Sequence, residues 1–130
     1  MNKDNPSEVN CGYKGHATIW EHYKETANKF AERQFLGTRD LVEEGTGTLI
    51  YSWKTHAQIF EIMEALARGL SYLGLCPEQK VEGKDFRFIG IIAKNREEWA
   101  VTALASLRSS VTIVPFYDSL AADVIAFVLN

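Results

Sequence analysis

Hydrophobic positions in residues 86–120 predict a strand-helix-strand unit. Residues 88–93 are an almost continuous apolar run of strand length, residues 97–108 alternate with a helical period, and residues 111–114 are a second, short β-branched run. Two strands joined by a helix of this length are expected to run parallel, with a right-handed crossover. Each strand is apolar on both faces, so each needs cover from both sides and further strands beside it.

A first amphipathic helix is predicted upstream. Thr18 and Glu21 have the spacing of a capping box, and an aromatic stripe then continues at helical spacing to about Arg33. The members of this stripe are Trp20, Tyr23, Ala27 and Phe30. Because such stripes normally face a core, we interpret it as a packing surface and not as a ligand site.

A second helix is predicted to follow a second capping box, formed by Thr55 and Gln58. Gly74 supplies a left-handed stop, and Pro77 comes shortly after it. Gly69 is expected to permit the close approach of a neighbouring element. The apolar seam of this helix consists of Ile59, Met63, Leu66, Leu70 and Leu73, and Glu64 and Arg68 are expected to form a surface pair.

Between these helices, residues 36–42 and 48–53 predict a β-hairpin. Leu49, Tyr51 and Trp53 alternate onto one face, and the connection at residues 43–47 contains two glycines. These glycines lack the GxxxxGK[ST] frame of a phosphate loop and do not lead from a buried strand into a helix, so they predict a turn.

Two loops are expected at the carboxyl ends of the parallel strands, where α/β proteins bind their ligands. This position draws attention to Asn95 and Arg96, although reciprocal capping by Asn95 and Glu98 suffices to explain Asn95. Residues 115–119 form the second loop, and a helix is expected from Leu120 with Asp118 or Ser119 as its cap. Residues 76–85, which precede the first strand, are expected to be a polar connection.

Composition narrows the class of protein. With 130 residues, 46% hydrophobic and 12% aromatic, the chain is long enough for one domain with a core. A formal charge of −3, from 14 basic and 17 acidic residues, leaves no basic stripe and disfavours nucleic acid as a partner. Cys11 and Cys76 stand far apart, with no CxxC motif, and we interpret them as free thiols of a reducing compartment.

No targeting or membrane-spanning segment is visible in the sequence. The first thirteen residues are polar, and no window approaches the roughly 18 apolar residues of a membrane span. We therefore expect an intracellular location, either cytosolic or peripheral on an organelle membrane.

Candidate chemistry is sparse. The chain lacks a phosphate loop with lysine, a GxSxG elbow, an HExxH helix and a recognisable serine–histidine–acid frame. Cys11, His16 and His22 match no standard metal-ligand spacing, and solvated roles are favoured for these histidines and for His56. The adjacent acids Glu43–Glu44 and Glu97–Glu98 suit solvation better than acid/base work.

Several stretches resemble, in order and spacing, the amino-terminal region of the long-chain fatty acyl-CoA synthetases, which are adenylate-forming, AMP-binding enzymes. These stretches are LGTR at 36–39, YSW at 51–53, GL at 69–70, FIGI at 88–91, NREEW at 95–99 and VPFYDSL at 114–120. The resemblance covers residues 18–130, and the NRxEW and PxYD stretches carry most of its specificity. Glu97 stands where the family usually has proline, and Ser119 where it usually has threonine.

The resemblance implies a two-step reaction that needs ATP, magnesium and coenzyme A in the full-length enzyme. A fatty acid carboxylate attacks the α-phosphate of ATP to give an acyl-adenylate, and the thiol of coenzyme A then displaces AMP. The phosphate-binding loop, acidic metal ligand, ribose-binding aspartate and catalytic lysine of the family all lie outside the matched region. We therefore assign no catalytic, cofactor-binding or metal-binding residue to this chain, and we expect it to bind no cofactor alone.

The fold class expected is α/β: the beginning of a doubly wound parallel sheet, with flanking helices and a β-hairpin, incomplete without further strands. Residues 1–15 are a polar extension and residues 16–130 an amino-terminal slice of the large domain of an adenylate-forming enzyme. The last helix lacks a stop signal, so the rest of a ligase, or a larger assembly, is expected to cover the strands.

Two alternatives stay open at this point. The chain could be a truncated, non-catalytic relative that acts as a structural or interaction subunit in a larger assembly. It could also be an unrelated small α/β binding domain. If the chain is either the ligase segment or the truncated relative, the 130 residues alone should show no fatty-acid-dependent turnover of ATP.

Overall fold

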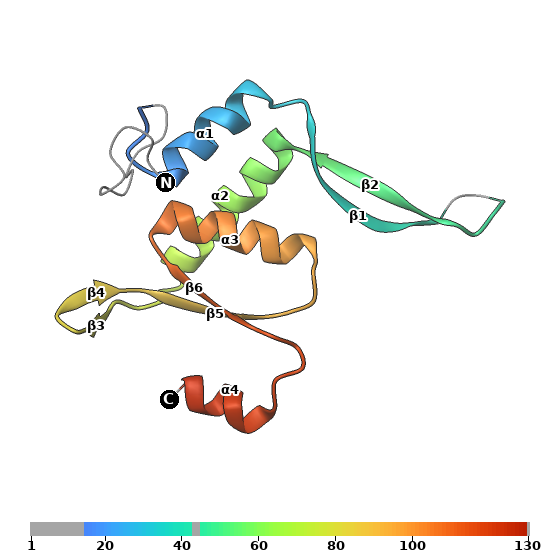
Figure 1. Cartoon of the computed structure of the whole chain (residues 1–130). Coiled ribbons are helices and arrows are strands. Elements are labelled where there is room, and N and C mark those ends of the chain that lie inside the picture. Colours follow the sequence, from blue (N-terminus) through green and yellow to red (C-terminus); the bar gives the residue numbers. More distant parts are fainter. Residues whose placement is uncertain (1–14, 43–44, 130) are drawn as a thin grey trace, which may run out of the picture.

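The computed structural model describes residues 15–42 and 45–129. Its elements follow in the order α1 (Ile19–Lys29), β1 (Gln34–Val42), β2 (Leu49–Thr55), α2 (His56–Tyr72), β3 (Gln79–Val81), β4 (Lys84–Phe86), β5 (Phe88–Ile92), α3 (Glu97–Ser109), β6 (Thr112–Phe116) and α4 (Ala122–Leu129). Figure 1 shows α1, α2 and α3 gathered together, the β1–β2 hairpin extending away from them, and α4 standing apart near the carboxyl terminus. The α/β class predicted from the sequence is confirmed.

Both predicted capping boxes are present. The Thr18 hydroxyl accepts a hydrogen bond from the Glu21 amide at 3.1 Å, and the Glu21 carboxylate accepts one from the Thr18 amide at 3.3 Å. Thr55 and Gln58 exchange the equivalent bonds at 3.3 and 2.9 Å. These bonds satisfy amide groups that have no partner inside the first helical turn, so both helices begin where the sequence predicts.

The ends of the helices follow the predictions less closely. Helix α1 stops at Lys29, before the predicted Arg33, and α2 stops before Gly74, whose φ of 64° confirms the left-handed stop. Two details of α2 were wrong. Leu73 is exposed, and a Cβ added at Gly69 would meet nothing within 4 Å, so Gly69 permits no close approach.

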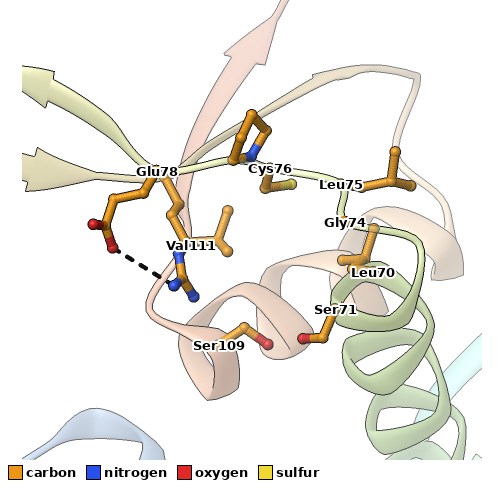
Figure 2. A pocket seen from close by; sticks show the side chains of 10 residues that line it. Leu70, Ser71, Gly74, Leu75, Cys76, Glu78, Ser109 and Val111 are labelled. Carbon is orange, nitrogen blue, oxygen red and sulfur yellow. Dashed lines mark ion pairs between the residues drawn. The ribbon is translucent and has the colours of Figure 1, made fainter.

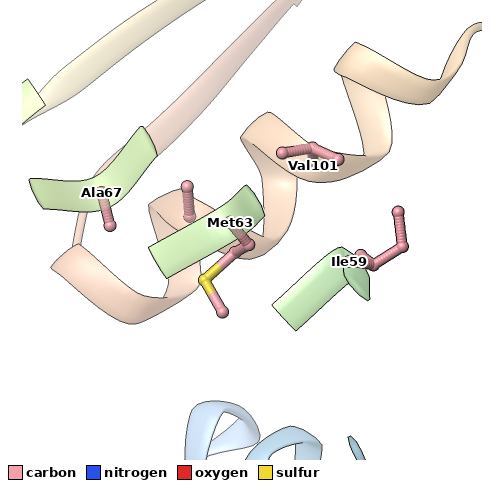
Figure 3. Close-up of a cluster of buried hydrophobic side chains, with 5 residues drawn as sticks. Ile59, Met63, Ala67 and Val101 are labelled. Carbon is pink, nitrogen blue, oxygen red and sulfur yellow. The ribbon is translucent and has the colours of Figure 1, made fainter. Parts of the chain in front are cut away.

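The core lies where α2 faces α3. Ile59, Met63 and Ala67 of α2 are buried against Val101 and Ala105 of α3 (Figure 3). Part of the predicted stripe on α1 contributes as well, because Trp20 and Tyr23 pack against this cluster. The core therefore consists of three helices and few large side chains, and most of its stabilisation comes from apolar area removed from water.

The predicted β1–β2 hairpin is confirmed as an antiparallel pair, with register shifts between Gln34 and Leu36 and between Thr38 and Leu41. Gly37 lies opposite Trp53, and a Cβ at Gly37 would come within 2.9 Å of the indole ring. The absence of a side chain at Gly37 therefore lets the Trp53 ring lie flat across β1.

A second hairpin, β3–β4, was not predicted. Residues 76–85 were interpreted as a polar connection, but Gln79, Lys80 and Val81 pair with Phe86, Asp85 and Lys84 in antiparallel register. Glu82 and Gly83, with φ of 50° and 78°, make the two-residue turn between them. The strands are short and exposed, so they carry no alternation of apolar and polar residues that could have revealed them.

Strands β5 and β6 are parallel, as predicted, and their pairing runs from Phe88 opposite Thr112 to Ile92 opposite Phe116. Gly90 of β5 leaves room for the Phe116 ring, which a Cβ there would approach to 3.0 Å. In the described part of the chain each of the three sheets has two strands, so both outer edges of the β5–β6 pair lack a neighbouring strand.

The last helix begins later than predicted. The Leu120 amide donates to the Tyr117 carbonyl in a turn, and the Ala121 carbonyl accepts the first helical bonds, from Val124 and Ile125. Asp118 and Ser119 therefore lie in the preceding turn and do not cap α4. Among the described helices, none combines the length and the apolar character that crossing a bilayer requires.

Candidate functional site

The carboxyl ends of β5 and β6 open onto a cleft of about 540 Å³. Because the two strands are parallel and in register, the turns that follow them lie at the same edge of the sheet. The cleft is lined by Ala93, Lys94, Asn95, Trp99, Pro115, Phe116, Tyr117 and Asp118. The sequence thus predicted the position of the cleft and one of its residues, Asn95.

Three of the eight residues that line this cleft are aromatic. Phe116 is buried, Trp99 is half-buried and Tyr117 is exposed, while Lys94 and Asp118 place one positive and one negative charge at the rim. Such walls can hold an apolar or flat group and orient it through the charged rim. Among the described residues that line this cleft there is no serine, cysteine or histidine.

The turn that begins α3 differs from the prediction. Arg96, and not Asn95, is the N-cap residue; its backbone is extended and its side chain does not cap the helix. Glu98 therefore makes no reciprocal cap. Instead the Arg96 guanidinium donates to both oxygens of the Glu98 carboxylate, at 2.6 and 2.5 Å. This hydrogen-bonded pair lowers the pKa of Glu98 to about 2.

A second cleft, of about 530 Å³, lies between the base of the β1–β2 hairpin and the start of α3, and it shares Asn95 with the first. Its floor contains an ion pair that the sequence did not reveal. Glu97, whose side chain is only 17% exposed, accepts hydrogen bonds from Lys54 Nζ at 2.7 Å and from the Thr38 hydroxyl at 3.4 Å. The prediction that Glu97 is solvated was therefore wrong: this carboxylate joins both hairpin strands to α3.

One sequence signal pointed to the contact between Glu97 and the hairpin: Glu97 stands where the long-chain fatty acyl-CoA synthetases usually have proline. Proline suits the first helical turn because it has no amide hydrogen to satisfy there. A carboxylate is equally favourable at a helix amino terminus and can also accept hydrogen bonds from another element. Glutamate at position 97 is therefore compatible with the start of α3 and also makes the contact with the hairpin.

A third cleft, of about 260 Å³, lies at the opposite edge of the β5–β6 pair, between the carboxyl ends of α2 and α3. Figure 2 shows Ser71 and Ser109 on the two helices and Cys76 across from them. Arg87 and Glu78, which also line this cleft, form an ion pair with a nitrogen–oxygen distance of 3.6 Å. Cys76 is a free thiol, as predicted, whereas Cys11 lies outside the described residues. This cleft faces away from the edge where α/β proteins bind their ligands.

The histidines are less solvated than predicted. His16 lies 2.6 Å from the Glu25 carboxylate and is mostly buried. The His56 ring stacks on Phe35, with 4.2 Å between the ring centroids, and its Nδ1 is buried with no hydrogen-bond partner among the described residues. Within residues 15–42 and 45–129, no three histidine, cysteine, aspartate or glutamate side chains gather in a way that could hold a metal ion.

The parallel strand pair, its crossing helix and the cleft at its carboxyl ends define an α/β protein. The chain belongs to the AMP-binding enzyme family, whose members it matches over residues 23–130.

Its relatives are long-chain acyl-CoA synthetases. The chain is 26% identical over 117 residues to long chain acyl-CoA synthetase 4 of Arabidopsis thaliana, covering 90% of this chain and 16% of that protein. It is 38% identical over 80 residues to long-chain-fatty-acid–CoA ligase 5 of Rattus norvegicus, covering 62% and 11%. It is 28% identical over 131 residues to the peroxisomal long chain acyl-CoA synthetase 7 of Arabidopsis thaliana, covering 98% and 17%. The chain thus spans about a sixth or less of the length of these relatives.

A solved structure shares the fold. The chain superimposes on the N-terminal subdomain of Klebsiella oxytoca NpsA with a TM-score of 0.65 and 19% identity, covering 86% of this chain and 24% of that chain. The same arrangement of helices and strands therefore occurs inside a unit about four times as long.

Proposed function

We propose that this chain is the amino-terminal segment of a long-chain fatty acid–CoA ligase. The whole enzyme would join a fatty acid to ATP as an acyl-adenylate and then transfer the acyl group to the thiol of coenzyme A. The observation that carries the proposal is the family match over residues 23–130 together with relatives that are long-chain acyl-CoA synthetases.

Within that enzyme the segment acts as scaffold. Adenylation needs a cradle for the ATP phosphates, a divalent cation to neutralise them and a cation at the transferring centre. The described residues offer one lysine and one aspartate at the rim of the cleft at the carboxyl ends of β5 and β6, and no cluster of metal ligands. On this proposal the ATP, magnesium and coenzyme A sites of the whole enzyme lie in the rest of the ligase.

The rest of the ligase is also the proposed partner of the β5–β6 pair. Parallel strands are normally covered on both faces and flanked by further strands. Here Ile92 is 56% exposed at the end of β5, and α4 presents Val124, Phe127 and Val128 to solvent. Burying these side chains removes apolar area from water, so further strands and helices of the same polypeptide would be stabilised by packing here.

We place the enzyme inside the cell, in the cytosol or peripherally on an organelle membrane. This rests on relatives that include peroxisomal synthetases.

The test compares two samples. The native polypeptide that carries this sequence is purified, its denatured mass is measured, and it is assayed for palmitoyl-CoA formation from palmitate, ATP and coenzyme A, with acetate as the control acid. The proposal expects a mass several times 14.7 kDa and palmitate-dependent activity, and it expects no activity from the 130-residue chain assayed beside it. A native polypeptide that activates no fatty acid, or acyl-adenylate formed by the 130-residue chain alone, would refute it.

A further inference from the structure

The β1–β2 hairpin carries large apolar side chains that stay about half exposed in the described part of the chain. Val42, Leu49, Tyr51 and Trp53 share one face and are 64%, 46%, 55% and 49% exposed. Ile50 adds an apolar side chain, 41% exposed, to the opposite face. The Tyr51 and Trp53 rings lie 5.8 Å apart and form a continuous aromatic surface on β2. We call these five residues the hairpin patch.

Isolated two-stranded hairpins are marginally stable in water, so a long one needs a packing partner. The hairpin has neighbours only near its base, and Figure 1 shows the outer part extending clear of the helices. At the base, Glu97 accepts hydrogen bonds from Lys54 on β2 and Thr38 on β1. These bonds join both strands to α3, so the direction in which the hairpin points is fixed before any partner arrives.

The size of the patch decides what kind of partner fits. Since an aromatic side chain buries about 150–250 Å², the half-exposed side chains of the patch offer roughly 500 Å². A stable interface between two proteins needs about 800 Å² from each partner. By itself the patch falls short of this area, which favours a partner within the same chain over a second copy or a separate protein. It suffices for packing within one chain, because intramolecular contacts do not lose the translational freedom that association costs.

The sequence also argues against lipid as the partner. The connection between the strands carries Glu43 and Glu44, and two carboxylates at this point of the sequence are costly to place in hydrocarbon. By contrast, the NpsA subdomain shows that this fold occurs inside a unit about four times as long, which provides further elements of the same chain.

We propose that the hairpin patch is an intramolecular docking surface, which inserts between elements of the remaining polypeptide and is aimed at them by the contacts of Glu97 at its base. The occupant is an apolar surface of the same chain, and Tyr51 and Trp53 are the main anchors. This inference rests on the proposed function, because it requires a longer ligase chain.

Hydrogen exchange measured by mass spectrometry tests the proposal. Amides of residues 49–53 should exchange at least about 100-fold more slowly in the native polypeptide than in the 130-residue chain, because docking suppresses local opening of the hairpin. Amides of residues 59–67 in α2 serve as the internal reference. Equal exchange of residues 49–53 in both samples overturns the proposal. Protection that rises with the concentration of the 130-residue chain, or that requires phosphatidylcholine vesicles, assigns the patch to a second copy or to lipid and overturns it too.

Two variants of the native polypeptide sharpen the test. Ile50→Lys should abolish most of the protection of residues 49–53, because it places a charge in the proposed contact. Tyr72→Lys, at a position on α2 that is 91% exposed, should leave the protection unchanged. Palmitoyl-CoA formation is measured on the same samples. Activity with an unprotected hairpin refutes the docking surface alone, whereas a protected hairpin without activity refutes the proposed ligase alone.

Discussion

Replacing Tyr23 with phenylalanine is expected to stabilise the chain. The Tyr23 ring packs among Trp20, Phe35 and Phe60, with centroid distances of 6.0, 6.2 and 6.4 Å. Its hydroxyl oxygen is buried and has no hydrogen-bond partner in the described part of the chain. Tyr23→Phe keeps the ring and removes only the unsatisfied group.

The magnitude follows from the cost of that group. A buried donor left without a partner costs about 1–3 kcal/mol. Because Tyr23 as a whole is only half-buried, the lower end applies, and Tyr23→Phe should raise the free energy of unfolding by about 1 kcal/mol. For a chain of this size that corresponds to an increase in Tm of about 3–5 °C. Urea denaturation followed by far-ultraviolet circular dichroism measures the first quantity, and thermal denaturation the second.

The pH dependence supplies an independent readout. Burial raises the pKa of Tyr23 above its ordinary value of 10.0. The folded state therefore favours the neutral phenol over the phenolate. The protein keeps its full stability with respect to this group below pH 10, and it loses stability as the pH rises from 10 through the pKa of Tyr23 in the folded state. The Tyr23→Phe variant should not show the part of the loss of stability above pH 10 that comes from ionisation of Tyr23.

Tyr72→Phe is the matched control, because Tyr72 is 91% exposed and its hydroxyl is free to bond with water. It should change the free energy of unfolding by less than about 0.5 kcal/mol. A loss of stability in Tyr23→Phe, with Tyr72→Phe unchanged, would show that the Tyr23 hydroxyl has a partner and would refute the reasoning.

Three further predictions concern the hairpin, the core and the start of α3. Gly37→Ala should lower the free energy of unfolding, measured by urea denaturation, by about 1–3 kcal/mol, because its Cβ would come within 2.9 Å of the Trp53 ring. Gly69→Ala should instead raise it by about 0.5–1 kcal/mol, because a Cβ there meets nothing within 4 Å. Equal effects of the two substitutions would contradict this geometry. Met63→Ala should lower the free energy of unfolding by about 2–5 kcal/mol in the same assay, because the Met63 side chain is fully buried. A decrease of less than about 1 kcal/mol would mean that water reaches this side chain in solution. In carbon-13 NMR the Glu98 carboxyl should titrate with a pKa of about 2. Its contribution to folding stability should then be complete above pH 4.5 and be lost as the pH falls through about 2. A titration midpoint near pH 4.5 would show that the Arg96 guanidinium does not bind this carboxylate in solution.

Features set by residues close in sequence were predictable. The two capping boxes depend on residues three positions apart, and the stop of α2 depends on Gly74 alone. The parallel β5–β6 pair followed from two apolar runs separated by a helix, because that connection length allows few other topologies. The edge that carries the cleft between Asn95 and Tyr117 could be located for the same reason.

Features that depend on a choice between distant partners were not predictable. Glu64 was expected to pair with Arg68, four positions away, but its carboxylate accepts a hydrogen bond from Arg108 Nε at 2.8 Å. Arg108 also lies over the Trp20 ring, 5.8 Å from its centroid, so two contacts fix it there. Glu97 likewise takes its partners from the hairpin, and no pattern in the sequence links positions so far apart.

The location of the core also bears on the order in which the chain acquires structure. The buried cluster is shared by α2 and α3, and α1 packs against it together with Phe35 and Leu36 at the base of the hairpin. In the described part of the chain, no residue of α4 belongs to it. Helices form rapidly from local contacts, whereas the outer hairpin and α4 gain little from burial in this part of the chain. During synthesis the three helices and the base of the hairpin can therefore assemble as soon as Ser109 has left the ribosome, while the outer part of the hairpin and α4 would be ordered further by later segments of the proposed ligase.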